Sequence, residues 1–218
     1  MSDPIVFYLD FISPYAYVAW NQVHAIAKKH DRTVTPIPIL FAAVLDAHGQ
    51  KGPAEIPAKR VYTFKDALRK AHHAGLPLVP PPSHPFNPLL ALRVASLPMD
   101  PTAQRKVIDA LYDATWRTGA GVENAALVEN AVTQAGFDGP ALVNAASEAS
   151  AKDRLRDATK AAIDRGVFGV PTVAIGDELF WGVDGLAFVD AFLRGEDPVP
   201  SDLQKLQRPV SAVRPRSS

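Results

Sequence analysis

A serine-proline pair stands where an apolar, strand-like segment gives way to a helical pattern. Residues 7–20 read FYLDFISPYAYVAW, apolar up to Phe11 and then, after Ser13 and Pro14, rich in aromatic residues and alanine at helical spacing. Serine followed by proline is typical of a helix start, with the serine as N-cap and the proline as first helical residue. The positive end of such a helix also attracts anions, so the Ser13 hydroxyl could face a bound ligand. Both interpretations of Ser13 stay open on this segment alone.

A thiol bound at this helix start would become more acidic. A free thiol has a pKa of about 8.5, so only a few per cent of it is thiolate at pH 7. The helix end is worth about 0.3–1 kcal/mol to an anion, and a hydroxyl hydrogen bond to a charged acceptor about 1.5–3 kcal/mol. Together they would lower the pKa of the thiol by roughly one to two units. Ser13 would then stabilise a nucleophile without being one.

The composition excludes several other kinds of site. The chain has no cysteine, which removes disulfides, thiolate metal ligands, cysteine nucleophiles and CxxC redox motifs. Its six histidines include no pair spaced to hold a metal from one helical face, and it contains neither a phosphate-binding glycine loop nor a GxSxG elbow. We therefore expect no metal site. Lys and Arg total 23, as do Asp and Glu, and no basic stripe occurs, so nucleic acid is not an expected partner.

The overall composition is that of an ordinary globular protein, with 218 residues of which 47% are hydrophobic and 21% charged. Its N-terminal segment carries Asp3 in place of a basic region, and the apolar run there covers only residues 5–9. The sequence predicts neither a signal peptide nor a membrane span, and we expect a cytoplasmic protein with no membrane partner.

Three segments around Ser13 predict a βαβ unit. Residues 5–11 read as a buried strand, residues 14–29 as a helix and residues 33–40 as a second strand. The strands of such a unit are parallel and its crossover is right-handed. Ser13 is therefore expected where the first strand ends and the helix begins.

Helical segments divided by Gly and Pro occupy residues 41–165, and the proline-dense segment 76–88 among them must be extended. That stiff segment could form the wall of a cleft. One helix carries an apolar stripe, which consists of Val107, Ile108, Leu111, Tyr112, Thr115 and Trp116.

A β pattern returns near the C-terminal end. Residues 172–175 and 179–181 flank a Gly-Asp turn and predict a hairpin, after which Asp184 is placed to cap a last helix at 186–193. Just before the hairpin, Val170-Pro171 is a candidate cis peptide bond. In thioredoxin-like proteins the residue before a cis-proline offers its backbone to an extended ligand. The alternative is a trans proline that only ends a loop.

The order of these elements predicts an α/β class protein with a thioredoxin-like fold and an inserted all-helical domain. We expect a discontinuous thioredoxin-like domain at residues 1–40 and 166–195 and the helical insertion at residues 41–165. Residues 196–218 are expected to form an extended C-terminal tail that lies on the surface or on a partner subunit.

Three motifs together resemble one family, namely DFISPYAY, PAKRVY and GVFGVPTVAIGDELFWGVDGL, which begin at residues 10, 57 and 166. Over residues 5–192 the chain resembles the glutathione-dependent 2-hydroxychromene-2-carboxylate isomerases, which are relatives of kappa-class glutathione transferases and of the DsbA-like branch of the thioredoxin superfamily. The resemblance implies glutathione as cofactor, a small aromatic carboxylate as substrate and a homodimer.

The resemblance also implies roles for individual residues. Ser13 matches the catalytic-site serine beside the glutathione sulfur, and Val170, before Pro171, matches the residue whose main chain pairs with the cysteinyl unit. Lys59 matches a lysine that meets the glycyl carboxylate, and Gln50 stands where relatives have Asn. Four further positions match the loop that holds the γ-glutamyl end: Trp181, Gly182, Val183 and Asp184.

Three of the matched positions and one further residue need comment. Relatives tend to have Ser or Asn where this chain has Val183, so one polar contact to the γ-glutamyl group is missing. Asn87 is a candidate on the substrate side. Asp184 could be a helix cap alone, and Trp181 could be a core residue alone.

The reaction implied by the resemblance converts 2-hydroxychromene-2-carboxylate to trans-o-hydroxybenzylidenepyruvate, a step in naphthalene-type aromatic catabolism. Glutathione thiolate adds to the unsaturated carbon, the ring opens, the former double bond rotates and the thiol is eliminated, so glutathione is regenerated. Two other functions stay open. One is a kappa-like transferase or peroxidase that consumes glutathione, and the other is a non-catalytic thioredoxin-fold binding protein.

Overall fold

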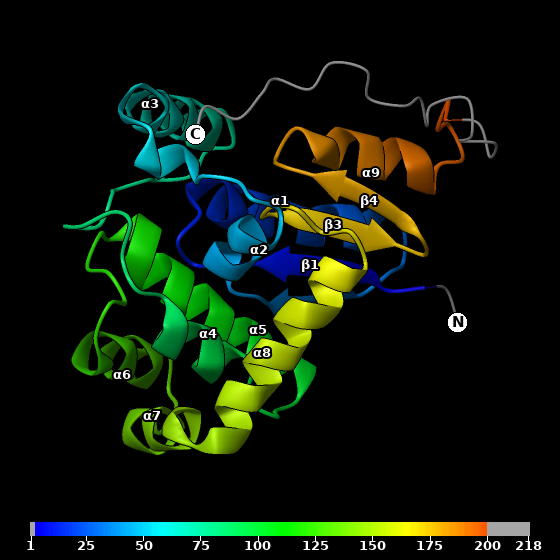
Figure 1. Cartoon of the computed structure of the whole chain (residues 1–218). Helices are drawn as coiled ribbons and strands as arrows, with labels where there is room; N and C mark the ends of the chain where they lie inside the picture. The colour runs from blue at the N-terminus through cyan, green and yellow to red at the C-terminus, as the bar shows by residue number, and fades with distance from the viewer. Residues whose placement is uncertain (1–2, 200–218) are drawn as a thin grey trace.

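The computed structural model describes residues 3–199, and a four-stranded sheet brings the first and last parts of that segment together (Figure 1). The strands lie in the order β2-β1-β3-β4. Their bounds are β1 (Ile5–Leu9), β2 (Val34–Pro38), β3 (Thr172–Ile175) and β4 (Glu178–Trp181). β1 runs parallel to β2 and antiparallel to β3, and β3 runs antiparallel to β4. The predicted βαβ unit and the predicted hairpin are confirmed, although β2 is shorter at both ends than expected.

Alternation along β1 directs its side chains into two apolar layers, as expected for a strand covered on both faces. Ile5, Phe7 and Leu9 pack in one cluster with residues of α1 (Pro14–Lys29) and α9 (Gly185–Leu193). Tyr8 packs in a second cluster, which includes Ala162 of α8 (Ala149–Asp164). In Figure 1, α8 accordingly lies in front of the sheet and α1 behind it. This arrangement is the expected thioredoxin-like α/β fold.

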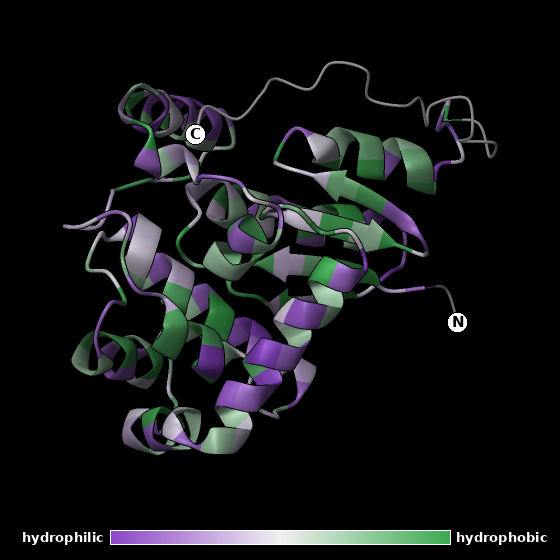
Figure 2. Ribbon diagram, viewed as in Figure 1, coloured by the Kyte–Doolittle hydropathy of each residue, from purple (hydrophilic) through white to green (hydrophobic). Residues whose placement is uncertain are grey.

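Between β2 and β3 the regular elements of the described chain are helical. They are α2 (Phe41–Ala47), a 3-10 turn (Pro53–Glu55), α3 (Pro57–His73), α4 (Leu89–Ala95), α5 (Pro101–Tyr112) with a following π-helical turn (Asp113–Arg117), α6 (Ala125–Gln134), α7 (Gly139–Ser147) and α8. The predicted apolar stripe of α5 and the π-helical turn is buried throughout. Figure 2 shows the contrast between the hydrophilic outer side of α8 and the largely hydrophobic β3 and α9. The division into two domains stays a prediction, and α8, assigned to the insertion, packs on β2.

The first strand ends two residues earlier than predicted, at Leu9 instead of Phe11. Directly after Leu9, the carboxylate of Asp10 accepts hydrogen bonds from the backbone N–H groups of Ile12 (3.0 Å) and Phe41 (2.9 Å). The Asp10 side chain thus satisfies two backbone donors at the point where the chain turns from β1 into α1.

No helix within residues 3–199 is long and apolar enough to cross a membrane. Of the predicted C-terminal tail, residues 200–218 lie outside the described part of the chain.

Candidate active site

Ser13 occupies the N-cap of α1, as the sequence predicts. Its side-chain oxygen accepts a hydrogen bond from the N–H of Ala16 at 3.2 Å, and Pro14 is the first helical residue. The hydroxyl also donates to the carbonyl of Val170 at 3.4 Å, close to the longest distance for such a bond. The serine is 8% exposed. Its weakly held proton can therefore turn to a stronger acceptor that binds at the helix start.

The loop before β3 lies against Ser13 and contains the predicted cis peptide bond. Val170-Pro171 is cis. The carbonyl of Pro171 accepts a hydrogen bond of 2.9 Å from the N–H of Gly182, which has a positive φ of 83° at the end of β4. Three segments far apart in sequence thus meet at one place: the start of α1, the cis-proline loop and the loop from β4 to α9.

Trp181 is 58% exposed, so its interpretation as a core residue alone is wrong. The indole lies against Phe168, with ring centroids 5.2 Å apart, and over the backbone of Gly169. A Cβ at Gly169 would be 2.5 Å from Nε1 of the indole, a distance that real contacts exclude. The glycine therefore permits the exposed aromatic pair, Phe168 and Trp181, next to the cis-proline.

Asp184 is at the N-cap of α9 but makes no side-chain capping hydrogen bond, so the prediction that it caps this helix with its carboxylate is wrong. The carboxylate is 82% exposed and lies 3.2 Å from Nζ of Lys70 on α3. Nζ is also 3.2 Å from the carboxylate of Asp66, which in turn accepts a 2.8 Å hydrogen bond from the hydroxyl of Tyr15. Sequence reasoning missed Lys70 and Asp66, since nothing in the helical pattern of α3 sets them apart.

Three more of the predicted site residues are exposed side chains: Gln50, Lys59 and Asn87. The fourth, Val183, is half-buried and packs against the main hydrophobic cluster. No hydrogen bond or ion pair within residues 3–199 links any of them to Ser13 or to the cis-proline loop. The side-chain oxygen of Asn87 accepts from the N–H of Leu89 at 3.1 Å, so it is bound to its own chain. Their roles toward a ligand stay predictions, as do those of the residues that the structure brings together.

The proline-dense segment 76–88 reaches the loop that precedes Ser13, where a cleft wall was expected. Nε2 of His84 lies 2.9 Å from the carbonyl of Ile12 and donates to it, because a carbonyl can only accept. Burial lowers the pKa of His84, although the hydrogen bond to Ile12 opposes this effect. The ring is enclosed by Phe64, Phe86 and Trp116. Sequence reasoning did not single out this histidine.

Asp10 lies beneath the site loop and is 1% exposed. Burial raises the pKa of its carboxyl to about 7, although the N–H groups of Ile12 and Phe41 act in the opposite direction. The same two hydrogen bonds tie the loop before Ser13 to the start of α2. Asp10 therefore fixes the loop that leads to Ser13. The only sequence signal for this role is its position directly after a buried strand.

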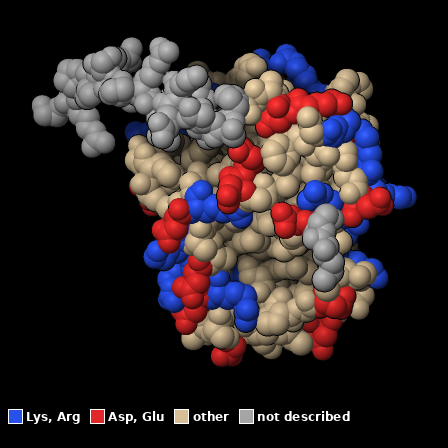
Figure 3. All heavy atoms as spheres, turned by 90° about the vertical axis from the view of Figure 1, so that its right-hand side faces the viewer, with Lys and Arg blue, Asp and Glu red and all other residues tan. Residues whose placement is uncertain are grey.

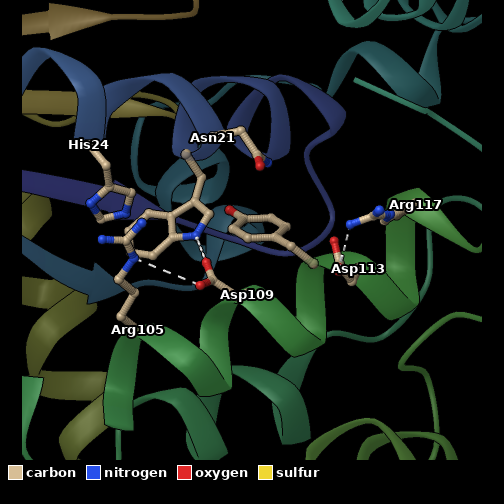
Figure 4. Close-up of a pocket in the computed structure, with 8 residues that line it drawn as sticks. Asn21, His24, Arg105, Asp109, Asp113 and Arg117 are labelled. Atoms are coloured by element: carbon tan, nitrogen blue, oxygen red, sulfur yellow. Dashed lines mark hydrogen bonds and ion pairs between the residues drawn. The ribbon is translucent and has the colours of Figure 1, made fainter. Parts of the chain in front are cut away.

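A second polar region of the molecule is a cavity of about 230 Å³ between α1 and α5 (Figure 4). It is lined by Trp20, Asn21, His24, Arg105, Asp109, Tyr112, Asp113 and Arg117, and none of these is a predicted site residue. The carboxylate of Asp109 accepts from the indole N–H of Trp20 at 2.6 Å and lies 3.8 Å from Arg105. Arg117 pairs with Asp113 at 3.4 Å. The charged groups of this cavity are therefore paired with neighbours one helical turn away.

The face of the molecule drawn in Figure 3 is not dominated by charges of one sign. Basic and acidic side chains are interspersed there around a hollowed centre made of other residues. Residues 3–199 contain no group of three His, Asp or Glu side chains placed to hold a metal ion.

Comparison with known proteins places this geometry in a family. A family model described as DsbA-like thioredoxin domain matches residues 4–194. The chain is 30% identical over 188 residues to 2-hydroxychromene-2-carboxylate isomerase of Pseudomonas putida, a match that covers 85% of this chain and 91% of that protein. It is 29% identical over 208 residues to glutathione S-transferase kappa 2 of Caenorhabditis elegans, a match that covers 87% of this chain and 91% of that protein. A solved structure of a 2-hydroxychromene-2-carboxylate isomerase superposes with a TM-score of 0.79 at 28% identity and covers 88% of this chain and 94% of that one.

The match to the family model spans β1 to α9. Together with the isomerase relatives it confirms the resemblance drawn from the motifs at residues 10, 57 and 166. The same isomerase name is carried by the sequence relative and by the solved structure. The chain therefore belongs to the DsbA-like thioredoxin family and, within it, to the 2-hydroxychromene-2-carboxylate isomerases, which makes it an isomerase.

Proposed function

We propose that this isomerase converts 2-hydroxychromene-2-carboxylate to trans-o-hydroxybenzylidenepyruvate and uses glutathione as its cofactor. The observation that carries the proposal is the position of the Ser13 hydroxyl, at the start of α1 and 3.4 Å from the carbonyl before the cis-proline. No cysteine stands there or anywhere in the chain, so a thiol used at this site must come from a bound molecule. Relatives named as this isomerase and as kappa glutathione transferases support the choice of reaction and of cofactor.

The residues at the helix start fit a thiolate. The first N–H groups of α1 lack partners within the helix and present its positive end, which stabilises a negative sulfur. The Ser13 hydroxyl gives up its long bond to the Val170 carbonyl and donates to the sulfur instead. Bound glutathione supplies the thiolate that adds to the unsaturated carbon of the substrate and leaves after rotation about the resulting single bond.

The exposed aromatic pair beside the cis-proline suits the substrate. Phe168 and Trp181 present ring surface to solvent next to Val170, and aromatic rings prefer offset or edge contacts with other rings. We assign this surface to the bicyclic part of the substrate. The roles proposed for Gln50, Lys59, Val183 and Asn87 follow from the family resemblance.

The test is a conversion assay with and without catalytic glutathione. The absorbance of 2-hydroxychromene-2-carboxylate is followed with enzyme while total thiol is measured in parallel. We expect conversion to trans-o-hydroxybenzylidenepyruvate only when glutathione is present, with the thiol conserved. Absence of conversion, or a rate indifferent to glutathione, would overturn the proposal.

A kappa-like transferase or peroxidase is the second candidate, favoured by the 29% identity to the kappa 2 enzyme over 91% of its length. It would deplete thiol in proportion to an added electrophile or peroxide, whereas the isomerase conserves it. The parallel thiol measurement therefore separates the two. The homodimer and the cytoplasmic location stay predictions, and size-exclusion chromatography with light scattering tests the first.

A further inference from the structure

The peptide unit that joins Ile12 to Ser13 is held at both of its polar groups. Its carbonyl, on Ile12, accepts a hydrogen bond of 2.9 Å from Nε2 of His84. Its N–H, on Ser13, donates to the carbonyl of Asp10 at 3.2 Å. A peptide unit is planar and its two polar groups lie on opposite sides, so these two bonds fix its orientation.

The orientation of this peptide unit determines where the Ser13 hydroxyl points. Ser13 is the N-cap of α1, with an extended conformation of φ −95° and ψ 114°, and the next residue already belongs to the helix. With a fixed plane on each side of its Cα, the direction of the Cβ is fixed as well, and only rotation about χ1 remains. The bond from His84 to Ile12 therefore bears on the hydroxyl that donates to Val170.

His84 is itself held by residues outside the loop that precedes Ser13. The centroid of its ring lies 5.1 Å from that of Phe64, 5.7 Å from that of Trp116 and 6.2 Å from that of Phe86. Its own carbonyl accepts a 2.9 Å hydrogen bond from the guanidinium group of Arg60 on α3. Arg60 belongs to the motif that begins at residue 57, and the proposed function gives it no role. The helical part of the chain thus fixes His84, and His84 fixes the carbonyl before Ser13.

The two ring nitrogens of His84 have unequal surroundings. Nε2 donates to the carbonyl of Ile12, whereas Nδ1 is buried and has no hydrogen-bond partner among residues 3–199. A buried polar atom without a partner is unfavourable, and a phenylalanine would fill the same aromatic enclosure without one. The contribution that only a histidine makes here is therefore the bond from Nε2. The enclosure also holds the preceding carbonyl, because the indole N–H of Trp116 donates to Phe11 at 2.7 Å.

We propose that His84 is a positioning residue for the Ser13 hydroxyl and, by holding the carbonyl of Ile12, keeps that hydroxyl directed at the sulfur of bound glutathione. His84 acts through Ser13 and not on the reacting atoms themselves. The role rests on the proposed function for the identity of the thiol. It adds a residue of the proline-dense segment 76–88 to the machinery of the reaction.

The test compares the wild type with His84→Phe, which keeps an aromatic ring in the enclosure but has no donor. The pKa of the bound glutathione thiol is measured from the ultraviolet absorbance of its thiolate, and this cysteine-free chain adds no thiolate of its own. We expect His84→Phe to raise the pKa of the bound thiol by about one unit. Turnover of 2-hydroxychromene-2-carboxylate should fall about tenfold, because a misdirected hydroxyl stabilises less thiolate.

A double-mutant cycle separates positioning from a general structural effect. In a Ser13→Ala background, where the hydroxyl is absent, His84→Phe should cause no further loss of turnover. The matched control is Tyr17→Phe, since the Tyr17 hydroxyl donates to the carbonyl of Pro77 at 2.9 Å. This change breaks a bond of the same length to the same proline-dense segment, but away from the Ile12 carbonyl. It should leave the thiol pKa and turnover unchanged.

Two conservative variants decide the question if the phenylalanine variant does not fold. The side-chain amide of His84→Gln can place an N–H donor near the position of Nε2, whereas the shorter amide of His84→Asn reaches only to the position of Nδ1. His84→Gln should retain most of the turnover, and His84→Asn should lose it. Thermal unfolding of every variant shows whether the fold is retained.

Each other outcome contradicts a stated claim. An unchanged thiol pKa in His84→Phe, an equal loss of turnover in the Ser13→Ala background, or equal turnover of the Gln and Asn variants would overturn the role of His84 and leave the isomerase untouched. A wild type that does not bind glutathione would overturn both the cofactor and the positioning role. The expected shift of the thiol pKa without conversion of the substrate by the wild type would overturn the isomerase reaction alone.

Discussion

The candidate site at Ser13 and the cavity between α1 and α5 are both rich in polar side chains, but they are built in different ways. The candidate site is assembled from segments as far apart in sequence as Ser13 and Gly182, and its Asp184 carboxylate is 82% exposed. In the cavity, Arg105 and Arg117 each pair with an aspartate four residues away on the same helical stretch. Unused charge and hydrogen-bonding capacity, more than polar density, therefore distinguish the candidate site.

The two regions also differ in the direction in which burial shifts the pKa of a titratable group. Burial raises the pKa of Asp10, beside the loop that leads to Ser13, to about 7. Burial and the nearby Arg105 lower the pKa of His24, in the cavity, to about 4. Asp10 thus favours its neutral form by holding a proton, and His24 favours its neutral form by losing one. Folding stability should respond to pH in opposite directions at the two positions.

The largest expected effect is therefore on the pH dependence of stability. Between pH 4 and 6.5 the folded chain binds more protons at Asp10 than the unfolded chain does, so this group makes stability fall as pH rises. At His24 the unfolded chain binds more protons, so this group makes stability rise with pH. Each can contribute a slope of up to about 1.4 kcal/mol per pH unit.

Urea unfolding of the wild type, Asp10→Asn and His24→Gln from pH 4 to 7 measures these slopes. Relative to the wild type, the free energy of unfolding of Asp10→Asn should rise with pH, and that of His24→Gln should fall. Differences of the same sign for both variants would contradict the assignment. Each variant serves as the control for the other, because all remaining groups cancel in the comparison with the wild type.

The next largest effect is expected at the helix start of the candidate site. Ser13→Ala removes the hydroxyl that we propose donates to the glutathione sulfur, and turnover should then fall about 10- to 100-fold. Asn124→Ala removes the side chain that caps α6, where Asn124 accepts from Leu127 at 3.0 Å. Both changes should cost about 1 kcal/mol of stability as lost caps. Steady-state kinetics and thermal unfolding of the two variants should therefore agree in stability and differ in turnover, and wild-type turnover in folded Ser13→Ala would refute its role.

A smaller effect is expected from the contact between Gly169 and the Trp181 indole. Gly169→Ala places a methyl group where only 2.5 Å is available, and the exposed ring must move aside. We expect kcat/KM to fall roughly tenfold because the aromatic surface is displaced, with little change in the unfolding temperature. The control is Gly176→Asn in the hairpin turn, where φ is +54° and nothing lies within 4 Å of an added Cβ. Equal kinetics of the two variants would contradict a role for Trp181 in contacting the substrate.

The smallest effect is expected in the cavity. Asp109→Asn keeps the oxygen that accepts from Trp20 and loses only the half-exposed ion pair with Arg105. Such a pair is worth about 0–1 kcal/mol, and turnover should not change. A fall in kcat comparable to that of Ser13→Ala would show that the cavity takes part in the reaction. It would contradict the distinction between the candidate site at Ser13 and the cavity between α1 and α5.

Local signals in the sequence predicted the framework of the site correctly. The N-cap serine, the proline after it and the hairpin turn depend on conformational preferences of one to four residues. The cis bond before Pro171 was favoured by its position at a strand entry, and the buried stripe of α5 follows from helical period. Because the chain has no cysteine, the sequence alone excluded any reaction in which the protein supplies the thiol, whatever its fold.

Contacts between distant segments were not predictable in the same way. The exposure of Trp181, the exposure of the Asp184 carboxylate and its pairing with Lys70 depend on which surfaces the fold brings together. Asp184 met the local rule for a helix cap, but its side chain reaches α3 instead. For Asp10, too, the second hydrogen bond comes from the N–H of Phe41, 31 residues away.

The sequence by itself thus determined the strand, the capped helix that presents Ser13, the cis-proline loop and the absence of any thiol of the chain's own. Only the tertiary structure decided which charges stay exposed and which are paired, and it placed Lys70 beside Asp184. The physical reason is range: caps, turns and periodicity are set by neighbouring residues, whereas exposure and ion pairing are set by packing between segments more than a hundred residues apart.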